Sequence, residues 1–211
     1  AWKEYFVCDS LSNDILETIK TLAHEGYPGH LYAYLFDKQL DISNAAKIMT
    51  STAHGEGWAT YVQLKLYDYI KTHNSIKNQV ACEWACDYLA LNEQLAYGAY
   101  AYWDYMIHIE GAGAKEIKRN MSILGFNADA ADDIYKTLIE MPAGYAAYGY
   151  GINYFQDLHT NAKEQLKDLY DEIEFNSVIL SEGWVPLGRL QEIVDAYIED
   201  TLTKYSHSFC E

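Results

Sequence analysis

The feature that most constrains the fold of this 211-residue chain is its shortage of helix breakers. Its three prolines are Pro28, Pro142 and Pro186, and long stretches rich in Ala, Leu, Tyr, Glu and Lys run between them. Proline removes a backbone donor and clashes with the preceding helical turn, so stretches that lack it can stay helical over many turns. No alternating strand pattern extends beyond a few residues. We therefore predict an all-α, multi-helix bundle-like fold.

The apolar periodicity and the capping residues place most of these helices. Gly125 is expected to end one helix, and Asn127 or Asp129 to begin the next. Pro186 lies just where the first turn of the last helix tolerates proline. The predicted helices span roughly residues 43–72, 76–108, 115–124, 127–139, 145–170 and 186–205.

Composition excludes several classes of protein. Half of the chain is hydrophobic and 22% is charged, which is inconsistent with a disordered chain. The formal net charge of −16 argues against nucleic acid and anionic membrane surfaces as partners. There is no apolar run of the roughly 18 residues that a membrane span requires. We expect a soluble, acidic domain over residues 1–211, with its cellular compartment left open.

The cysteines and tyrosines are expected to be packing residues. The four cysteines, Cys8, Cys82, Cys86 and Cys210, are too few for a disulfide scaffold and form no C-x-x-C pair. We interpret them as small buried hydrophobes. Most of the 20 tyrosines should pack between helices, while a few could line a polar cleft.

The most informative stretch contains His24, Glu25 and His30. A familiar zinc motif has two histidines four residues apart on one helix, with the glutamate between them acting as base. Here the histidines are six residues apart, so an unbroken helix would rotate them by about 240° from each other. Pro28 and Gly29 can end the helix and let His30 turn back towards His24. The spacing is therefore compatible with a metal site, provided that the helix breaks.

Glu56 is the candidate third ligand. It stands between two glycines in an otherwise apolar helix, where an unpartnered carboxylate is costly to bury. Two histidines and one glutamate form the open ligand set of catalytic zinc, with Glu25 left to deprotonate water. The alternatives are that His54 replaces Glu56, that Glu56 caps a neighbouring helix or pairs with Lys47 or Lys65, and that the His-Glu pair is an ordinary surface or core feature.

Four collinear motifs resemble a known family, the bacterial domain-of-unknown-function 885 family. The segment 22–32, LAHEGYPGHLY, resembles its A-H-E-x-Y-P-G-H signature, and EGWATY at 56–61 resembles its E-G-W-A-x-Y element. PAGYAAYGYG at 142–151 and FNSVILSEGWVPL at 175–187 are similar to two later elements. Asp104 and His108 match a D-x-x-x-H element in between. The resemblance extends from about residue 16 to residue 197.

This resemblance implies a zinc-dependent, gluzincin-like peptidase of mainly helical fold, in a family with some secreted or lipid-anchored members. It assigns metal-ligand roles to His24, His30 and Glu56, and the general base to Glu25. Tyr148 becomes the candidate donor to the oxyanion.

Further residues have weaker roles under this resemblance. His108 is expected in the active site, although a histidine is also favoured at a helix C-terminus by the dipole. Asp104 would orient a histidine from behind, or be a solvated helix charge. Tyr145 and Tyr150 are expected to line the substrate cleft, unless the glycines around them serve only to let two helices approach. Three other histidines have polar neighbours and are expected at the surface: His73, His159 and His207.

The chain also departs from the family pattern. Family members are more than twice as long, with a large helical region ahead of the His-Glu motif. Together with the absence of an initiating Met, this predicts that the chain is the C-terminal catalytic part of a longer protein, whose N-terminal region would be its partner. Gly144 stands in place of an expected Gln, and Gly149 in place of a basic residue. Arg119 and Arg189 are the only arginines, so recognition of a substrate carboxylate lacks an obvious cation.

The expected function is zinc-dependent hydrolysis of a peptide or small amide bond. The closest alternative is the same zinc site acting on a non-peptide conjugate. A different alternative is a protein without catalysis: a fragment that binds metal but cannot turn over, or a helical module whose tyrosine-rich face docks a partner.

Overall fold

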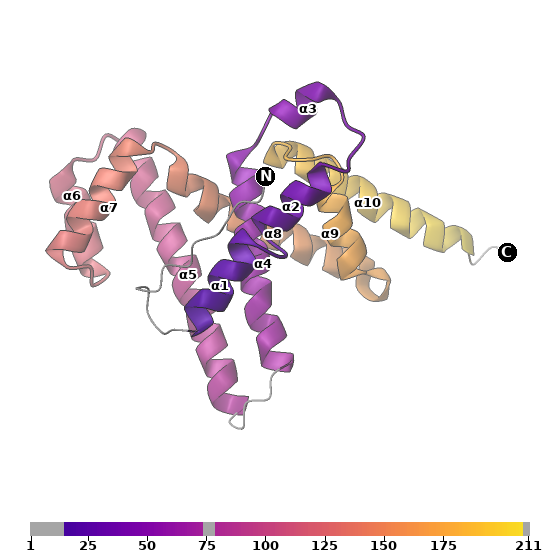
Figure 1. Ribbon diagram of the computed structural model, residues 1–211, viewed down its shortest axis with the longest axis horizontal. Helices are drawn as coiled ribbons and strands as arrows, with labels where there is room; N and C mark the ends of the chain where they lie inside the picture. Colours follow the sequence, from indigo (N-terminus) through magenta and orange to yellow (C-terminus); the bar gives the residue numbers. More distant parts are fainter. Residues whose placement is uncertain (1–14, 74–78, 209–211) are drawn as a thin grey trace.

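The computed structural model describes residues 15–73 and 79–208, and every regular element within these ranges is a helix (Figure 1). This confirms the predicted all-α fold. Ten α-helices and one 3₁₀ turn are described: α1 Ile15–Glu25, α2 His30–Asp37, α3 Asn44–Ile48, α4 Thr52–Thr72, α5 Gln79–His108, α6 Ala114–Ile123, α7 Ala128–Glu140, α8 Gly144–Leu166, η1 Lys167–Leu169, α9 Glu172–Leu180 and α10 Leu187–Ser208.

The centre of the fold is the crossing of α4 and α8. A β-carbon added to Gly57 would lie 2.8 Å from the ring of Phe155 and 3.0 Å from the α-carbon of Gly151. A β-carbon on Gly151 would meet the backbone of α4 at 2.7–2.8 Å. The two backbones are therefore in direct contact at this point, which only glycine allows. Gly149 allows an equally close contact between α8 and α5, because a β-carbon there would lie 2.5 Å from the carbonyl oxygen of Tyr97.

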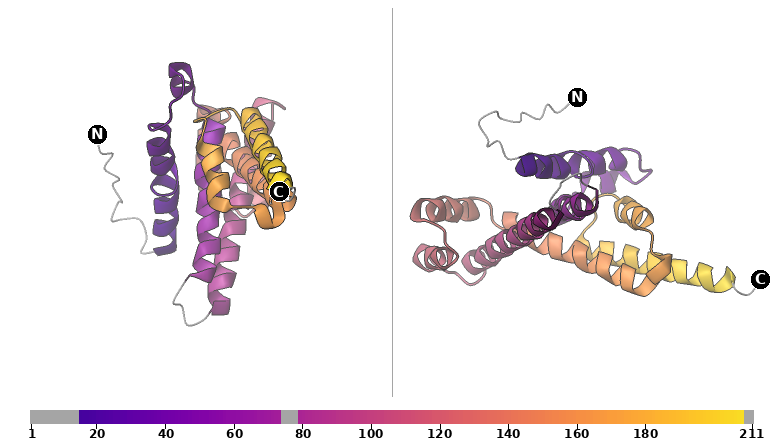
Figure 2. Two further views of the ribbon diagram at one scale, coloured as in Figure 1. Left: turned by 90° about the vertical axis from the view of Figure 1, so that its right-hand side faces the viewer. Right: turned by 90° about the horizontal axis from the view of Figure 1, so that it is seen from below.

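Three apolar clusters surround this crossing. The largest lies between α2, α4, α8, α9 and α10 and is centred on Trp58, Phe155 and Phe175. A second joins α4, α5 and α8 and contains Cys82 and Cys86, which are buried as predicted. Cys8 and Cys210 lie outside the described residues. The third packs α6 and α7 on the end of α5. In Figure 2, α1 and α2 stand at one side of the molecule and α10 at the other.

Helix boundaries differ from the predicted ones in three places. The helix expected over 43–72 is split, because Ser51 caps a new helix by accepting a hydrogen bond of 3.3 Å from the amide of His54. The helix expected to reach residue 170 ends at Leu166. The short helix α9 was not predicted. Asn127 caps α7 as expected, accepting a 2.9 Å bond from the amide of Ala130.

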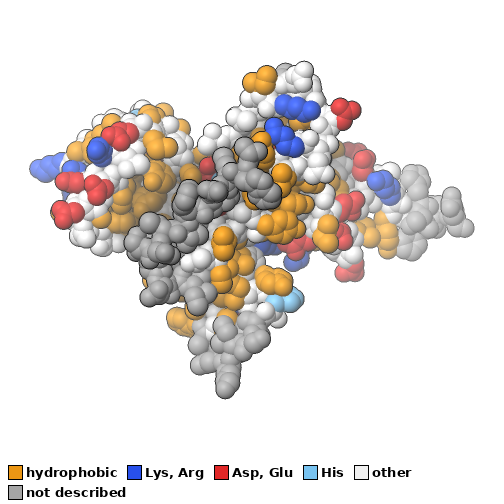
Figure 3. Space-filling view, in the orientation of Figure 1, with side chains coloured by type: hydrophobic (Ala, Val, Ile, Leu, Met, Phe, Trp, Pro, Cys, Tyr) orange, Lys and Arg blue, Asp and Glu red, His pale blue; other side chains and the backbone are white. Residues whose placement is uncertain are grey.

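The surface over α1 and α2 is strongly apolar. Large hydrophobic side chains gather on the face of these helices seen in Figure 3. In α1, α2 and the turn between them, the large hydrophobic residues that are more than 40% exposed are Leu22, Tyr27, Tyr34 and Leu35. Within the described ranges, no helix combines the length and apolar character that a membrane crossing demands.

Candidate metal centre

The turn between α1 and α2 brings the two histidines together. Helix α1 ends at Glu25, the chain turns through Pro28 and Gly29, and α2 begins at His30. A β-carbon on Gly29 would collide with the carbonyl oxygen of His24, so the chain can fold back this closely only with glycine here. The structure thus confirms the break that the spacing of the two histidines requires.

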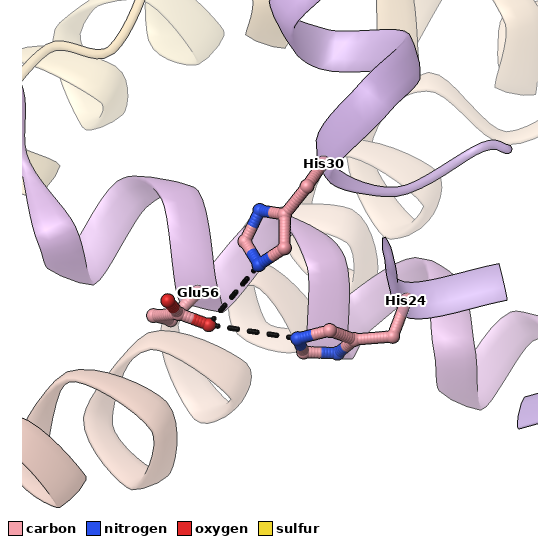
Figure 4. A group of neighbouring side chains, drawn as sticks. All are labelled: His24, His30 and Glu56. Atoms are coloured by element: carbon pink, nitrogen blue, oxygen red, sulfur yellow. Dashed lines mark ion pairs between the residues drawn. The ribbon is translucent and has the colours of Figure 1, made fainter. Parts of the chain in front are cut away.

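Helix α4 supplies the third member, Glu56. Its neighbours Gly55 and Gly57 both face large rings, those of Trp184 and Phe155, at distances that leave no room for a β-carbon. The backbone on each side of Glu56 is therefore pressed against the core, and its carboxylate is directed at the two imidazoles (Figure 4).

The three side chains converge on a small volume. Oε2 of Glu56 lies 3.5 Å from Nε2 of His24 and 3.3 Å from Nε2 of His30. One ligand atom from each residue lies within 4.8 Å of the other two. The imidazole rings meet edge to face, with centroids 4.8 Å apart. His24 is buried, and the side chains of His30 and Glu56 are about one-fifth exposed.

This arrangement fits a zinc ion. Tetrahedral ligands at 2.0–2.1 Å from zinc are separated from each other by about 3.3 Å, close to the two nitrogen–oxygen distances observed here. Oε2 of Glu56 is buried and accepts no hydrogen bond, so it is an orphaned acceptor with two nitrogens facing it. Two imidazole nitrogens and one carboxylate oxygen are the donor set of open, catalytic zinc sites.

Electrostatics also favour an ionised Glu56. Burial raises the pKa of Glu56, but contacts with His24, His30 and Tyr148 outweigh it and lower that pKa to about 2. The alternative pairing with Lys65 is wrong, since that ammonium lies 2.9 Å from Glu172 and 3.0 Å from Nε2 of His159.

A pocket of about 290 Å³ opens beside His24. Glu25, Tyr145 and Tyr148 line it together with Gln63 and other residues. Three predicted site residues therefore line the same pocket as the candidate ligand His24. The Tyr148 ring stacks on His24 at 6.3 Å. Burial, and then the charge of Glu56, raise the pKa of the Tyr148 hydroxyl well above its usual range, so it remains a proton donor.

Comparison with known protein families identifies the family of this chain. Residues 13–194 match the family described as bacterial protein of unknown function, DUF885. The chain belongs to the DUF885 family. No curated protein matches it.

Two solved structures share the fold of this DUF885 chain. One is a protein from Colwellia psychrerythraea provisionally classed as a lipoprotein, with a TM-score of 0.70 and 21% identity, covering 88% of this chain and 31% of that one. The other, from Shewanella oneidensis, is also provisionally classed as a lipoprotein and is of unknown function. It has a TM-score of 0.69 and 16% identity, covering 88% of this chain and 34% of that one. The DUF885 chain thus spans about a third of the length of these solved relatives.

Two predicted residues of the DUF885 chain form a separate pair. Asp104 accepts a 3.1 Å hydrogen bond from the amide of Ala143, and its Oδ1 lies 3.4 Å from Nε2 of His108. The His108 ring nitrogen lies 2.9 Å from the carbonyl oxygen of Leu138. Asp104 therefore neighbours a histidine that is not a candidate ligand, and neither Asp104 nor His108, which was expected in the active site, lines the pocket beside His24. The pair holds the turn before α8, where Ala143 has a left-handed φ of 63°.

Tyr150 is not brought to the pocket. It is 60% exposed and contacts Tyr154, and it follows Tyr148 by two residues, about 200° around α8. The neighbouring glycines, Gly149 and Gly151, allow close helix approach rather than forming a cleft wall.

Two other histidines do not lie where they were considered: His54 as an alternative ligand and His159 as a surface residue. His54 is not a ligand: it is 1% exposed, its Nδ1 lies 3.0 Å from the carbonyl oxygen of Val185, and burial lowers its pKa to about 4. His159 is not a surface residue. It is half-buried against the rings of Tyr61, Tyr170 and Phe175, whereas His73 is exposed as expected and the side chain of His207 lies outside the described residues.

Sequence reasoning missed two residues behind His24. Nδ1 of His24 lies 2.9 Å from Oε1 of Gln63, and Gln63 is bonded to Glu93 of α5. The only local signal was the spacing of seven residues between Glu56 and Gln63, which puts both on one face of α4. Nothing in the sequence pointed to Glu93, because its contact depends on how α5 packs.

Proposed function

We propose that this DUF885 protein is a zinc-dependent hydrolase of peptide or related amide bonds. The observation that carries the proposal is the convergence of His24, His30 and Glu56 on one small volume, with Glu25 and Tyr148 lining the adjoining pocket. A structural zinc site would be closed by a fourth protein ligand, whereas a three-ligand site with a pocket beside His24 leaves a position for water and substrate.

His24, His30 and Glu56 would hold the metal. A bound zinc ion supplies a Lewis acid that polarises the scissile carbonyl and lowers the pKa of water to about 7. Glu25 follows the ligand His24 directly and faces the same pocket, so its carboxylate can take a proton from the attacking water and pass it to the leaving amine. Tyr148 keeps its proton and can donate a hydrogen bond to the developing oxyanion. Tyr145 would contact the substrate.

The proposal is tested first by metal content. Purified protein is stripped with chelator, offered zinc, desalted and measured by elemental mass spectrometry. We expect about one zinc per chain in the wild type, and loss of that zinc in Glu56→Ala and His30→Ala. Glu199→Ala, which removes an exposed carboxylate from α10, is the matched control and should keep the metal. A wild-type chain that retains no zinc would exclude the site.

Substrate class is tested next, with short peptides compared with acylated amino acids and other small amides. Because the chain spans about a third of its solved relatives, the panel is run with this chain and with the full-length protein encoded by its gene. Turnover of peptides supports the peptidase, and turnover of small conjugates alone supports the amidohydrolase. Zinc binding without turnover in either form would contradict a catalytic role and leave a metal-binding module.

A further inference from the structure

A line of buried polar side chains runs from His24 through Gln63, which also lines the pocket, to Glu93. Nε2 of His24 faces Glu56, while Nδ1 lies 2.9 Å from Oε1 of Gln63. The Gln63 side chain amide in turn donates to Oε2 of Glu93. His24, Gln63 and Glu93 are 8%, 2% and 9% exposed, so each bond is shielded from water. The line joins α1, α4 and α5.

Glu93 is surrounded by donors. Its Oε1 accepts a 2.8 Å hydrogen bond from the hydroxyl of Tyr67, which is itself 2% exposed, and lies 3.4 Å from the ammonium of Lys20. Its Oε2 accepts from Gln63. A carboxylate in this position can only accept, so the group that faces it from Gln63 must be the amide NH₂.

This orientation propagates to His24. With the NH₂ of Gln63 bound to Glu93, the carbonyl Oε1 is the end that reaches His24, and a carbonyl oxygen can only accept. Nδ1 of His24 must therefore carry the proton that fills this bond. Nε2 faces Glu56 and His30, so it is the nitrogen of His24 that is left to bind a metal when the site is loaded.

We infer that Gln63, oriented by Glu93, is a positioning residue that fixes the tautomer and the ring orientation of His24. The inference builds on the proposed zinc site, but the hydrogen bond that it assigns, from Nδ1–H of His24 to Gln63, is present in the metal-free chain. Outer-shell partners of this kind change metal affinity by 10- to 100-fold when removed. The free-energy cost of burying the polar groups of His24, Gln63, Glu93 and Tyr67 is compensated because each of them has a hydrogen-bond partner in the line.

The test uses three variants. Gln63→Met keeps the side-chain length and removes the acceptor. Glu93→Gln keeps the shape of Glu93 and removes the carboxylate that orients Gln63. The exchange Gln63→Glu/Glu93→Gln rebuilds the line, because the carboxylate at position 63 accepts from His24 and from the amide at position 93. Gln191→Met on α10 is the control for the Gln-to-Met change itself.

The first readout is the ¹⁵N chemical shifts of the imidazole of His24 in metal-free protein at pH 8. We expect Nδ1 of His24 to carry a proton bonded to Gln63 in the wild type and in the exchange variant, and to lose that proton in part of the molecules of Gln63→Met. A wild-type His24 protonated mainly on Nε2 would overturn the inference. So would an unchanged tautomer in both single variants. This readout stands even if the chain binds no zinc, a result that would reject the proposed function alone.

The second readout is zinc affinity, measured by competition with a chromophoric chelator. Gln63→Met should raise the Kd for zinc by 10- to 100-fold, and the exchange variant should return it to within a few-fold of the wild type. A merely structural role would give no such rescue. If Gln63→Met fails to fold by circular dichroism, Glu93→Gln carries the test, with a weaker site expected. Wild-type affinity in a folded single variant would contradict the positioning role.

Discussion

The indole nitrogen of Trp58 donates a hydrogen bond of 3.1 Å to the carbonyl oxygen of Pro28. This bond ties α4, two residues beyond Glu56, to the turn that separates His24 from His30. Trp58 is 2% exposed and packs in the largest apolar cluster, so the turn is anchored to the core rather than free at the surface. The two candidate histidine ligands and the candidate carboxylate ligand are thus coupled through one buried side chain.

Glu25→Gln tests the general base. The amide cannot accept a proton from water, so kcat should fall by at least about 100-fold, while zinc content stays at the wild-type value. Steady-state kinetics on a substrate found in the panel and elemental mass spectrometry measure the two quantities. Glu199→Gln, an exposed change on α10, should affect neither. Full activity in Glu25→Gln would reject this role.

Tyr148→Phe removes the proposed oxyanion donor. We expect kcat to fall by about 100-fold with little change in KM, as for the loss of one oxyanion-hole donor. Zinc should be retained, because the hydroxyl is not a candidate ligand. Tyr150→Phe is the matched control, since its hydroxyl lies on the exposed side of the same helix. Equal effects from the two variants would show that Tyr148 has no special place in the chemistry.

Gly57→Ala tests the contact between α4 and α8. The added methyl would overlap the ring of Phe155 and the backbone of Gly151, so we expect the free energy of unfolding to fall by more than about 2 kcal/mol. Gly98→Ala on α5 has nothing within 4 Å of the new methyl and should instead stabilise the chain by about 0.5–1 kcal/mol. Urea unfolding of both variants measures the contrast, and similar values would contradict the packing described.

His159 predicts a pH dependence of stability. Burial, and then the charge of Lys65, lower the pKa of His159 from 6.5 to about 4 in the folded chain. Between these pH values the unfolded chain binds more protons at His159 than the folded chain does. The stability that neutral His159 contributes is therefore fully present above pH 6.5 and is lost as the pH falls towards 4.

His159→Gln keeps an acceptor for Lys65 and does not titrate. Between pH 7 and pH 4.5 the wild type should therefore lose about 1–2 kcal/mol more unfolding free energy than the variant, a figure reduced for the ring's partial contact with solvent. Urea unfolding at the two pH values provides the comparison. Parallel losses in both proteins would mean that His159 does not titrate in this window.

The predictable parts of the structure depended on local chemistry. The break between His24 and His30 could be foreseen because Pro28 and Gly29 act within a single turn. Helix α9 was missed because it is short and lies between two better-marked helices. Gln63, Glu93 and the pairing of Asp104 with Ala143 depend on which helices meet, and that is decided by packing between distant parts of the chain. Tyr150 was misassigned because proximity in sequence to Tyr148 says little about the side of the helix.

The two glycines that flank Glu56 also bear on how the protein would respond to a chelator. In a zinc finger the metal holds the fold together, and its removal unfolds the chain. Here the backbone around Glu56 is wedged between Trp184 and Phe155, contacts that need no ion. Chelation should therefore remove the proposed zinc ion without unfolding the helices. The proposed activity that is lost with the metal should return when zinc is added back.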